Sequence, residues 1–417
     1  MGFREFIEKL KKDGELLEIT KPVSPIFEAP KMAFQDKRPI LFQDCMGRRA
    51  AMNVMNSRES FAKALGVTPE NIINKLSGTS FDGEVKHVDN SPMFEVRSKA
   101  NLSKLPIMKH FKKDGGAYIT AGIVVSKYKD NVNASIHRLM VVNDTTLAAR
   151  LVPPRHTYVM HREAAKHNEP LQVGIVIGVD PVTVFAASTR VPEGKEWEYA
   201  SSLKGEPVEL VTLDNGVEVP HGEIVLEGSI DPVEKVKEGP FVDITGSYDH
   251  IRPEPIINLT NMYTRKDPIY HGILPGGSEH KLLMGVPYEP LIYKAVGGVT
   301  KVRNVVLTEG GCCYLHAIVQ IEKQTEGDGK NAIMAAFAAH TSLKHVVVVD
   351  SDINIFDPMD VEYALATRVK ADRDVMIISN VRGSSLDPVS EDNVTSKMGI
   401  DATKPLKASE KFERAKI

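Results

Sequence analysis

Apolar and polar positions alternate with a period of two through the middle of the chain. Three runs show this pattern, with the turn-forming stretches KDNVN and NDT between them: AYITAGIVVSKY (117–128), ASIHRLMVV (134–142) and TLAARLV (146–152). Such alternation predicts half-buried strands, so the runs predict an antiparallel meander. Further on, Asp214, Asn215 and Gly216 separate two β-rich runs, and residues that tolerate positive φ predict a hairpin there. Together with the runs GEIVLEGSI and PIINLTNMYTR, this predicts a barrel-like sheet.

Helical and strand patterns mix at the two ends of the chain. Near the start, helical spacing over Phe3–Leu17 and Ser57–Leu65 accompanies the short apolar runs PILFQ and AAMNV, which predicts a peripheral α/β unit. Near the end, strand-like runs alternate with helical runs. The run HVVVVD (345–350) predicts a strand buried on both faces, as in a parallel sheet flanked by helices. Asp357 followed by Pro358 predicts a helix start.

These patterns place the chain in the α/β class and predict three domains. The first is an N-terminal α/β domain over residues 1–115, and the second is a barrel-like domain over 116–300. The third is a C-terminal α/β domain with a parallel sheet over 301–417, whose tail KASEKFERAKI predicts a surface helix or a partner-binding arm. The length of 417 residues also exceeds that of one ordinary core.

Composition and charge exclude several classes of partner. Hydrophobic residues make up 42% and charged residues 26%, which is typical of a soluble globular protein. The net charge of -3 has no long basic run, which argues against nucleic acid, because phosphate binding needs a concentrated basic surface. No apolar run reaches membrane-spanning length and the first residues do not resemble a signal peptide, so we expect a cytoplasmic protein. Cys45, Cys312 and Cys313 are too few for a disulfide framework, and we expect buried reduced thiols.

Two apparent motifs fail on chemistry, and the glycine-rich nucleotide-binding loops are absent. Asp350, Asp352 and Asn354 resemble the start of a calcium loop. However, Ile355 and Val361 occupy the positions that need a glycine and a bidentate glutamate. The run GGCC has neither redox spacing nor a nearby base, so a catalytic thiol is not supported. No GxGxxG or Walker loop occurs, which argues against a Rossmann or P-loop nucleotide site.

Two segments carry glutamates that could do chemistry. Glu223 and Glu227 lie four residues apart in a strand-like run and share one face. A buried carboxylate is costly without a partner, so we expect a cation opposite them unless this face is solvated. The glycine-rich loop before Glu279 presents this residue and His280 beside an apolar stretch. A carboxylate held near an apolar ligand can donate a proton, whereas the alternative is an ordinary charged surface loop.

Seven segments, in this order, resemble one enzyme family: NASIHR, ARLVPPRH, EIVLEGSIDPVEKVKEGPFVDITGSYD, PIYHGILPGGSEHKLLMG, HVVVVDSDINIFDPMDVEYALATR, NVRGSSLDP and GIDATKP. In these motifs the chain resembles the UbiD family, decarboxylases that use prenylated flavin mononucleotide (prenylated FMN). The resemblance covers nearly the whole chain. It implies an N-terminal α/β domain, a central split β-barrel that binds the flavin, and a C-terminal α/β domain that helps to form a homodimer or a higher homo-oligomer. It also implies a flavin prenyltransferase as the supplier of the cofactor.

Residue by residue, the resemblance implies a cofactor site and two catalytic residues. Asn133 and Glu227 would be ligands of a divalent metal, manganese or magnesium, that holds the flavin phosphate, with potassium as an optional further ion. The residues that would line the flavin and its phosphate are Ile136, His137, Arg138, Arg150, Leu151, Val152, Arg155 and His156. Arg138 would orient the substrate carboxylate, and Glu279 would protonate the carbon that loses carbon dioxide. Many cations in 133–156 would then face a phosphate and a carboxylate.

The chain departs from the family pattern near the expected metal. A histidine ligand is common at the position of Pro154, so His156, two residues later, is the candidate for the third ligand. Strict alternation also puts Asn133 and Arg138 on opposite faces of one strand. A bulge near Ala134 would be needed to bring both to the flavin.

The substrate stays open within the family. Leu274 stands where members acting on aromatic acrylates have a second glutamate, and with the variant LVPPRH this resembles an archaeal branch. That branch decarboxylates trans-anhydromevalonate 5-phosphate to isopentenyl phosphate in isoprenoid biosynthesis, and Arg155, His156, His280 and Lys281 would hold the substrate phosphate. A 4-hydroxy-3-polyprenylbenzoate-type aromatic acid is the alternative substrate. A non-catalytic flavin-binding protein and a flavin oxidoreductase are alternatives of another class, although no nicotinamide site is recognised.

Overall fold

The computed structural model describes residues 1–407 and 409–415, and the chain divides into two compact units. The first unit comprises Met1–Pro69 and Thr79–His280, and the second comprises Glu70–Gly78 and Lys281–Ile417. The predicted domains 1–115, 116–300 and 301–417 stay a prediction. Of the tail predicted as a surface helix or arm, residues 408, 416 and 417 lie outside the described residues, and Ser409–Phe412 form a short 3₁₀ helix.

A small mixed sheet of the first unit brings together segments far apart in sequence. Its order is β1 (Leu17–Ile19), β2 (Ile40–Cys45), β3 (Arg48–Met52) and β18 (Ile269–Gly272). The helix α1 (Phe3–Lys12) presents Phe3, Phe6, Ile7 and Leu10 at helical spacing and buries them against this sheet. Helices α2 (Glu28–Gln35) and α3 (Arg58–Leu65) follow, and α3 begins where the Ser57 side chain accepts from Ser60 N–H.

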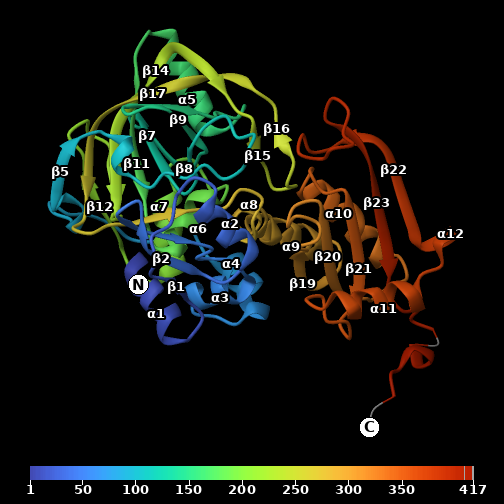
Figure 1. Cartoon of the computed structure of the whole chain (residues 1–417). Coiled ribbons are helices and arrows are strands. Elements are labelled where there is room, and N and C mark those ends of the chain that lie inside the picture. Colours follow the sequence, from blue (N-terminus) through green and yellow to red (C-terminus); the bar gives the residue numbers. More distant parts are fainter. Residues whose placement is uncertain (408, 416–417) are drawn as a thin grey trace. The chain divides into compact units, whose positions relative to one another are not determined.

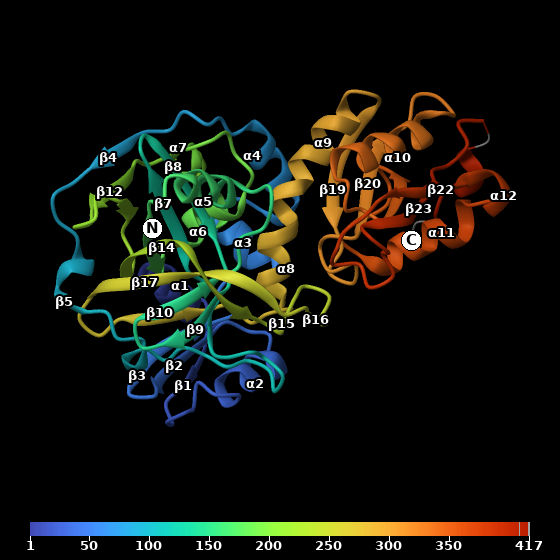
Figure 2. The same ribbon diagram turned by 90° about the horizontal axis from the view of Figure 1, so that it is seen from above.

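A nine-stranded antiparallel sheet forms the rest of the framework of this unit, and its two longest strands, β14 and β17, run side by side (Figure 1, Figure 2). Its main path runs through β6 (Tyr118–Ile119), β9 (Leu139–Asn143), β10 (Thr146–Ala149), β17 (Arg252–Thr264), β14 (Ile224–Glu238), β11 (Leu171–Ile177), β7 (Ile123–Tyr128) and β8 (Asn131–Ile136), and β5 (Val96–Lys99) pairs with β17. Among the described residues, the end strands of this path, β6 and β8, do not pair with each other, so the strand pairing does not close the sheet into a barrel.

Two sets of elements cover this sheet. The helix α5 (His156–Lys166) packs against β7, β8, β11 and β14, and α6 (Pro181–Ser188) packs against both β8 and α7 (Glu196–Lys204). The predicted hairpin at Asp214–Gly216 is confirmed between β12 (Val208–Thr212) and β13 (Glu218–Pro220), which form a separate sheet with β4 (Val85–His87). A further hairpin consists of β15 (Phe241–Val242) and β16 (Tyr248–Asp249).

The second unit is a five-stranded mixed sheet with helices, and the strands of this sheet are drawn in orange and red in Figure 1. Its strand order is β19 (Lys301–Leu307), β20 (His316–Glu322), β21 (His345–Asp350), β23 (Val394–Ala402) and β22 (Val375–Arg382). The helices of this unit are α4 (Ile72–Gly78), α9 (Glu289–Gly297), α10 (Asp328–Ala339), α11 (Pro358–Arg368) and α12 (Ala371–Asp374), and α8 (Ser278–Gly285) spans the division between the units.

Several local predictions for this second unit can be compared with the structure. All four valines of β21 are buried, and the Asp357 side chain caps α11 by accepting from Met359 N–H at 3.0 Å, so both predictions are confirmed. The parallel sheet is confirmed for β20, β21 and β23. It is wrong for β19 and β22, which pair antiparallel at the two edges because short connections join each to its neighbour.

Candidate functional site

Five polar side chains from β8, the residue after β8 and the start of α5 form one hydrogen-bonded group. This polar cluster consists of Asn133, Ser135, His137, His156 and Thr157. The Asn133 amide nitrogen donates to Thr157 Oγ1 at 2.9 Å and to Ser135 Oγ at 3.1 Å, and its Oδ1 lies 3.2 Å from His156 Nδ1. Alternation along β8 puts Asn133 and Ser135 on the same face, which α5 covers. The structure thus brings the predicted ligands Asn133 and His156 together.

A buried carboxylate lies beside this cluster. Glu196, the first residue of α7, is buried and accepts a hydrogen bond from the backbone N–H of Ala134, next to Asn133. Burial raises the pKa of Glu196 to about 7, because an ionised carboxylate loses its hydration there. Glu196 was not predicted from the sequence. Helical spacing could have revealed it, since Glu196, Ala200 and Leu203 lie on one buried face of α7.

The structure does not bring Glu227 to Asn133. The register across β14, β11, β7 and β8 aligns Glu227 with Ala134, so Glu227 points to the opposite face of the sheet from Asn133. Three strand spacings also separate them, or about 14 Å. Glu227 instead accepts from Tyr263 OH and Asn261 Nδ2, both at 2.7 Å. A metal shared by Asn133 and Glu227 is therefore incompatible with this register.

The two glutamates that were predicted to share a face are both buried, with different partners. Glu223 binds Arg4 through two hydrogen bonds of 2.6 and 2.8 Å and lies 3.5 Å from Arg265. The cation expected opposite these glutamates is thus present for Glu223. The alternative, a face exposed to solvent, is wrong for both Glu223 and Glu227. Glu227 is satisfied by neutral donors, which include the backbone N–H of Asn215 in the hairpin.

Arg138 lies in a group of carboxylates. Its Nε and Nη2 donate to Glu238 at 3.0 and 2.8 Å, and Nη2 lies 3.1 Å from Asp249. Burial opposes the charge of Arg138, but its hydrogen bonds to Glu238 and the negative charges of Glu238, Asp249 and Asp243 together outweigh burial and raise the pKa of Arg138. Only Nη1 has no carboxylate oxygen within hydrogen-bonding distance in the described part of the chain, since Asp243 is 3.9 Å away. The predicted bulge in β8 is wrong, because β8 pairs with β7 in unbroken register and ends at Ile136, before Arg138.

The remaining predicted cofactor residues lie near the polar cluster. His137 donates from Nδ1 to the carbonyl of Arg150 at 3.0 Å, which joins the two predicted segments. The Arg150 side chain pairs with Glu254 at 2.6 Å. Leu151 is buried, Ile136 is half-buried, and Val152 is exposed.

Arg155 differs from Arg138 and Arg150 because no carboxylate pairs with it among the described residues. It is exposed and precedes α5. Burial lowers the pKa of His137, and the nearby charge of Arg155 lowers it further. Arg155 is therefore close to the polar cluster and available to an anion, beside the N-terminus of α5, where backbone N–H groups also favour negative charge.

Glu279 occupies the first turn of α8 rather than a loop, and it is buried. Its carboxylate accepts from the backbone N–H groups of Val54 and Met55, each at 3.1 Å, and lies 3.1 Å from His271 Nε2. Glu279 and Arg138 form no ion pair in the part of the chain that the structure describes. Each of the two side chains therefore has partners of its own.

The donor set near Asn133 fits a hard divalent cation. An amide oxygen, an imidazole and a carboxylate are supplied by Asn133, His156 and Glu196, and such ligands suit manganese and magnesium. Among the described residues, no three His, Cys, Asp or Glu side chains form a metal-binding group by themselves. A metal there would therefore need the amide oxygen of Asn133.

Comparison with known proteins identifies the family. Models of the UbiD family, described as 3-octaprenyl-4-hydroxybenzoate carboxy-lyase, match the chain with their N-terminal domain over 7–79, their Rift-related domain over 85–278 and their C-terminal domain over 281–402. The chain belongs to the UbiD family. Its relatives in the UbiD family are named decarboxylases, and the chain is therefore a decarboxylase.

Two UbiD relatives match over their full length. Anhydromevalonate phosphate decarboxylase of Methanosarcina mazei is 63% identical over 100% of this chain and 99% of that protein. The protein of the same name from Methanothermobacter thermautotrophicus is 46% identical, over 99% of each chain. Both are archaeal relatives of this chain.

A solved structure of a UbiD-class enzyme supports the same fold. HmfF from Pelotomaculum thermopropionicum in complex with FMN has a TM-score of 0.97 and 39% identity, over 100% of this chain and 97% of that chain. A dimeric evolved form of HmfF in complex with prFMN has a TM-score of 0.92 and 37% identity, with the same coverage. The α/β fold class is thus confirmed.

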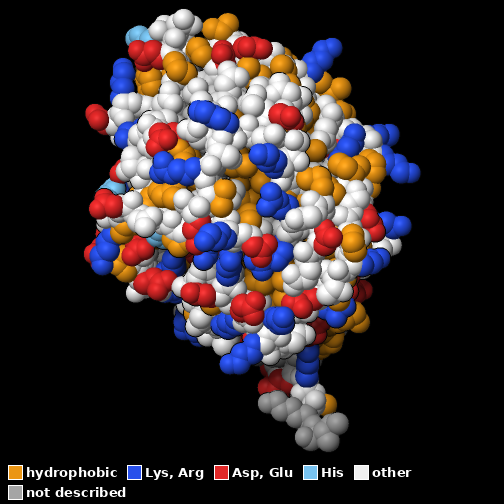
Figure 3. Space-filling view, turned by 60° about the vertical axis from the view of Figure 1, so that its left-hand side comes forward, with side chains coloured by type: hydrophobic (Ala, Val, Ile, Leu, Met, Phe, Trp, Pro, Cys, Tyr) orange, Lys and Arg blue, Asp and Glu red, His pale blue; other side chains and the backbone are white. Residues whose placement is uncertain are grey.

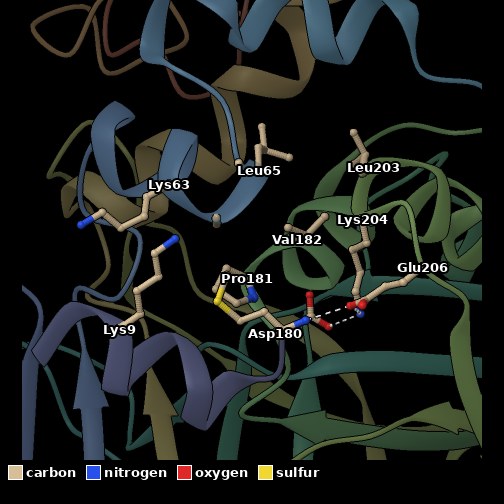
Figure 4. Close-up of a pocket in the computed structure, with 12 residues that line it drawn as sticks. Lys9, Lys63, Leu65, Asp180, Pro181, Val182, Leu203, Lys204 and Glu206 are labelled. Atoms are coloured by element: carbon tan, nitrogen blue, oxygen red, sulfur yellow. Dashed lines mark hydrogen bonds and ion pairs between the residues drawn. The ribbon is translucent and has the colours of Figure 1, made fainter. Parts of the chain in front are cut away.

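A separate cavity of about 250 Å³ lies elsewhere in the first unit of this UbiD protein (Figure 4). Lys204 pairs there with Asp180 at 3.3 Å and with Glu206 at 3.5 Å, and Lys63 pairs with Asp13 and Glu15. On the face shown in Figure 3, basic and acidic side chains are interspersed. None of the helices in the described residues is long and apolar enough to cross a bilayer. The paired charges give the cavity no evident functional role.

Proposed function

We propose that this chain decarboxylates trans-anhydromevalonate 5-phosphate to isopentenyl phosphate with prenylated FMN and a divalent metal. The observation that carries the substrate is the 63% identity, over the whole chain, to a protein named anhydromevalonate phosphate decarboxylase. The family and the FMN and prFMN complexes of HmfF support the flavin. A flavin prenyltransferase would supply the cofactor.

The metal and the flavin phosphate would be held at the polar cluster. Asn133 and His156 were predicted ligands, and we propose Glu196 in place of Glu227 as the carboxylate ligand, because it bonds to the backbone N–H of Ala134, next to Asn133. Arg155 and the N-terminus of α5 would bind phosphate oxygens. When bound, the prenylated flavin would supply the carbon framework that bonds to the substrate and would delocalise the electron pair left by carbon dioxide until the substrate carbon is protonated.

Arg138 would orient the substrate carboxylate. Glu238 fixes one edge of its guanidinium through two hydrogen bonds and leaves Nη1 for an added ligand. A guanidinium held in this way needs little further ordering to bind a carboxylate. Glu279 would deliver the proton that replaces carbon dioxide, since it is a buried carboxyl group in a segment that the family motif shares.

Co-expression with a flavin prenyltransferase tests this function. The absorbance spectrum and mass of the bound cofactor would be recorded, and carbon dioxide release from trans-anhydromevalonate phosphate would be measured. We expect prenylated FMN and release of one carbon dioxide per isopentenyl phosphate formed. Release from a hydroxybenzoate but not from the phosphorylated acid would refute the substrate, and protein without flavin would refute the cofactor.

The variant Glu279→Gln distinguishes a decarboxylase from a flavin-binding protein. Glutamine keeps the size of the side chain but cannot act as an acid, so we expect turnover to fall by about 100-fold or more while flavin binding is retained. Unchanged turnover would exclude Glu279 as the proton donor.

A further inference from the structure

Three N–H donors surround the carboxylate of Glu279 in the first unit. The Met55 N–H and His271 Nε2 both contact Oε1 at 3.1 Å, and the Val54 N–H contacts Oε2 at 3.1 Å. Glu279 and His271 are each 1% exposed, so water does not compete for these bonds. We call this arrangement the carboxylate cradle.

Local geometry explains why the two amides point at one carboxylate. The strands β3 and β18 are parallel neighbours, with Ala51 beside His271, so the residues after β3 lie next to those after β18. Asn53 then adopts a positive φ of 57° and turns the chain. Its amide nitrogen holds the turn by donating to the carbonyls of Ala33 at 2.8 Å and Asp36 at 3.0 Å. Asparagine tolerates this conformation better than most residues.

The hydrogen bonds make the two oxygens of Glu279 unequal. A carboxylate has about four acceptor positions, two on each oxygen. Donors from Met55 and His271 fill both positions of Oε1, whereas Val54 fills only one position of Oε2. One position on Oε2 therefore stays open for a proton.

The hydrogen bonds of His271 also indicate where its own proton lies. Nε2 faces a carboxylate oxygen, which can only accept from it when ionised. Nδ1 is buried and has no hydrogen-bond partner among the described residues. A proton on Nδ1 would leave a buried N–H without an acceptor, so the ring that carries its proton on Nε2 is favoured.

We propose that His271 is a positioning residue for the acid Glu279, and that Oε2 of Glu279 is the atom that delivers the proton. This inference rests on the proposed function. Loss of carbon dioxide leaves an electron pair on the substrate carbon. The proton on Glu279 Oε2 moves to that carbon, the O–H bond breaks, and a carbon–hydrogen bond forms with the electron pair. The carboxylate that remains is stabilised by the cradle and takes its next proton from solvent.

The cradle would accelerate this step because its donors meet negative charge as that charge develops. Fixed N–H groups in a buried site need no reorganisation when the proton leaves. Only proline would remove the backbone N–H groups of Val54 and Met55, and it would also constrain the backbone, whereas the imidazole of His271 can be replaced without changing the main chain. His271 is therefore the residue through which the cradle can be tested.

The test compares His271→Leu, His271→Gln and His271→Asn in the flavin-loaded protein. Glutamine can place an amide N–H near the position of Nε2, while asparagine is too short to reach Glu279 and leucine has no donor. His161→Leu serves as the matched control, since His161 is also a buried histidine of this unit with one hydrogen bond, to the Asp231 carbonyl.

We expect His271→Leu to lower kcat by about 100-fold to 1,000-fold, as loss of one donor to a developing oxyanion does. The KM should stay within about threefold, because the donor acts on the proton transfer rather than on substrate binding. His271→Gln should recover at least about tenfold of the loss and His271→Asn should not. Equal kcat values for His271→Gln and His271→Asn would overturn the proposal. This comparison does not need the leucine variant, so it holds even when that variant does not fold. The control should keep its kcat.

A second readout needs neither flavin nor substrate. In protein with ¹⁵N-labelled histidine, the signal that disappears in His271→Gln should report a proton on Nε2 and none on Nδ1. A signal from a ring protonated on Nδ1 would overturn the assignment.

The kinetic comparison uses trans-anhydromevalonate phosphate or, where the wild type prefers it, a hydroxybenzoate. A wild type that acts only on the hydroxybenzoate therefore refutes the proposed substrate. The role of the carboxylate cradle is still tested by the ratio of the kcat values of the variants.

Discussion

The substitution Glu196→Gln tests whether a metal belongs beside Asn133. In the metal-free protein, burial raises the pKa of Glu196 from 4.5 to about 7, a difference that corresponds to about 3 kcal/mol. The folded protein therefore binds more protons than the unfolded chain between these two values. The stability of the metal-free protein should then decrease as the pH rises through this window, because burying the charged form is unfavourable.

Glutamine removes the charge and keeps the shape. At pH 8 and without metal, we expect the variant to be more stable than the wild type by up to about 3 kcal/mol, and the difference should vanish toward pH 4.5. Urea denaturation followed by tryptophan fluorescence measures this, since Trp197 is the single tryptophan of the chain and is buried next to Glu196. Glu198→Gln is the matched control, because Glu198 forms a surface pair with Lys195 and should change stability by less than about 0.5 kcal/mol.

Added manganese should reverse the order. A metal at 1,000 times its dissociation constant stabilises the folded wild type by about 4.1 kcal/mol, which exceeds the deficit of about 3 kcal/mol, and the variant, which lacks the carboxylate, should gain much less. The reasoning is refuted if the metal-free variant is less stable than the wild type at pH 8. Equal stabilisation of both proteins by manganese would exclude Glu196 as a ligand.

Three further predictions follow from individual side chains. Glu227→Gln should lower the free energy of unfolding by about 1 to 3 kcal/mol, because it disturbs buried hydrogen bonds. It should leave the stabilisation by manganese unchanged in the same urea assay, and a loss of that stabilisation would return Glu227 to the metal site. Arg138→Lys cannot keep both hydrogen bonds to Glu238, so kcat should fall by about 100-fold with flavin content unchanged; full activity would exclude the orienting role. Burial raises the pKa of Cys45 to about 12, so a thiol reagent at pH 8 should modify Cys45 only after unfolding, as mass spectrometry of the native and urea-treated protein would report.

Much of the local structure could be predicted from the sequence. The Asp214–Gly216 hairpin, the buried strand over 345–350 and the cap at Asp357 depend on residues close together in the chain. Backbone preferences, side-chain capping and hydrophobic period act over a few residues, so the pattern of the sequence is sufficient to reveal them. The family motifs likewise identified Asn133, His156 and Glu279 as candidates before their positions were known.

The sidedness of the site was decided only by tertiary structure. Asn133 and Glu227 both alternate correctly within their own strands, yet the register through β11 and β7 puts them on opposite faces. Register across four strands depends on all the pairings between them, and a shift of one residue would reverse the faces. The pattern of one strand therefore cannot determine whether a residue of a distant strand lies on the same face of the sheet.

The partners of the buried acids were also determined by long-range packing. Glu196 reaches Ala134 from α7, and Glu279 meets the amides after β3, more than two hundred residues earlier in the chain. By itself, the sequence determined the residue types that can hold a metal or donate a proton, together with the helices and strands that carry them. Tertiary structure decided which of these groups meet, because contacts between distant segments arise only when sheets and helices pack around a common core.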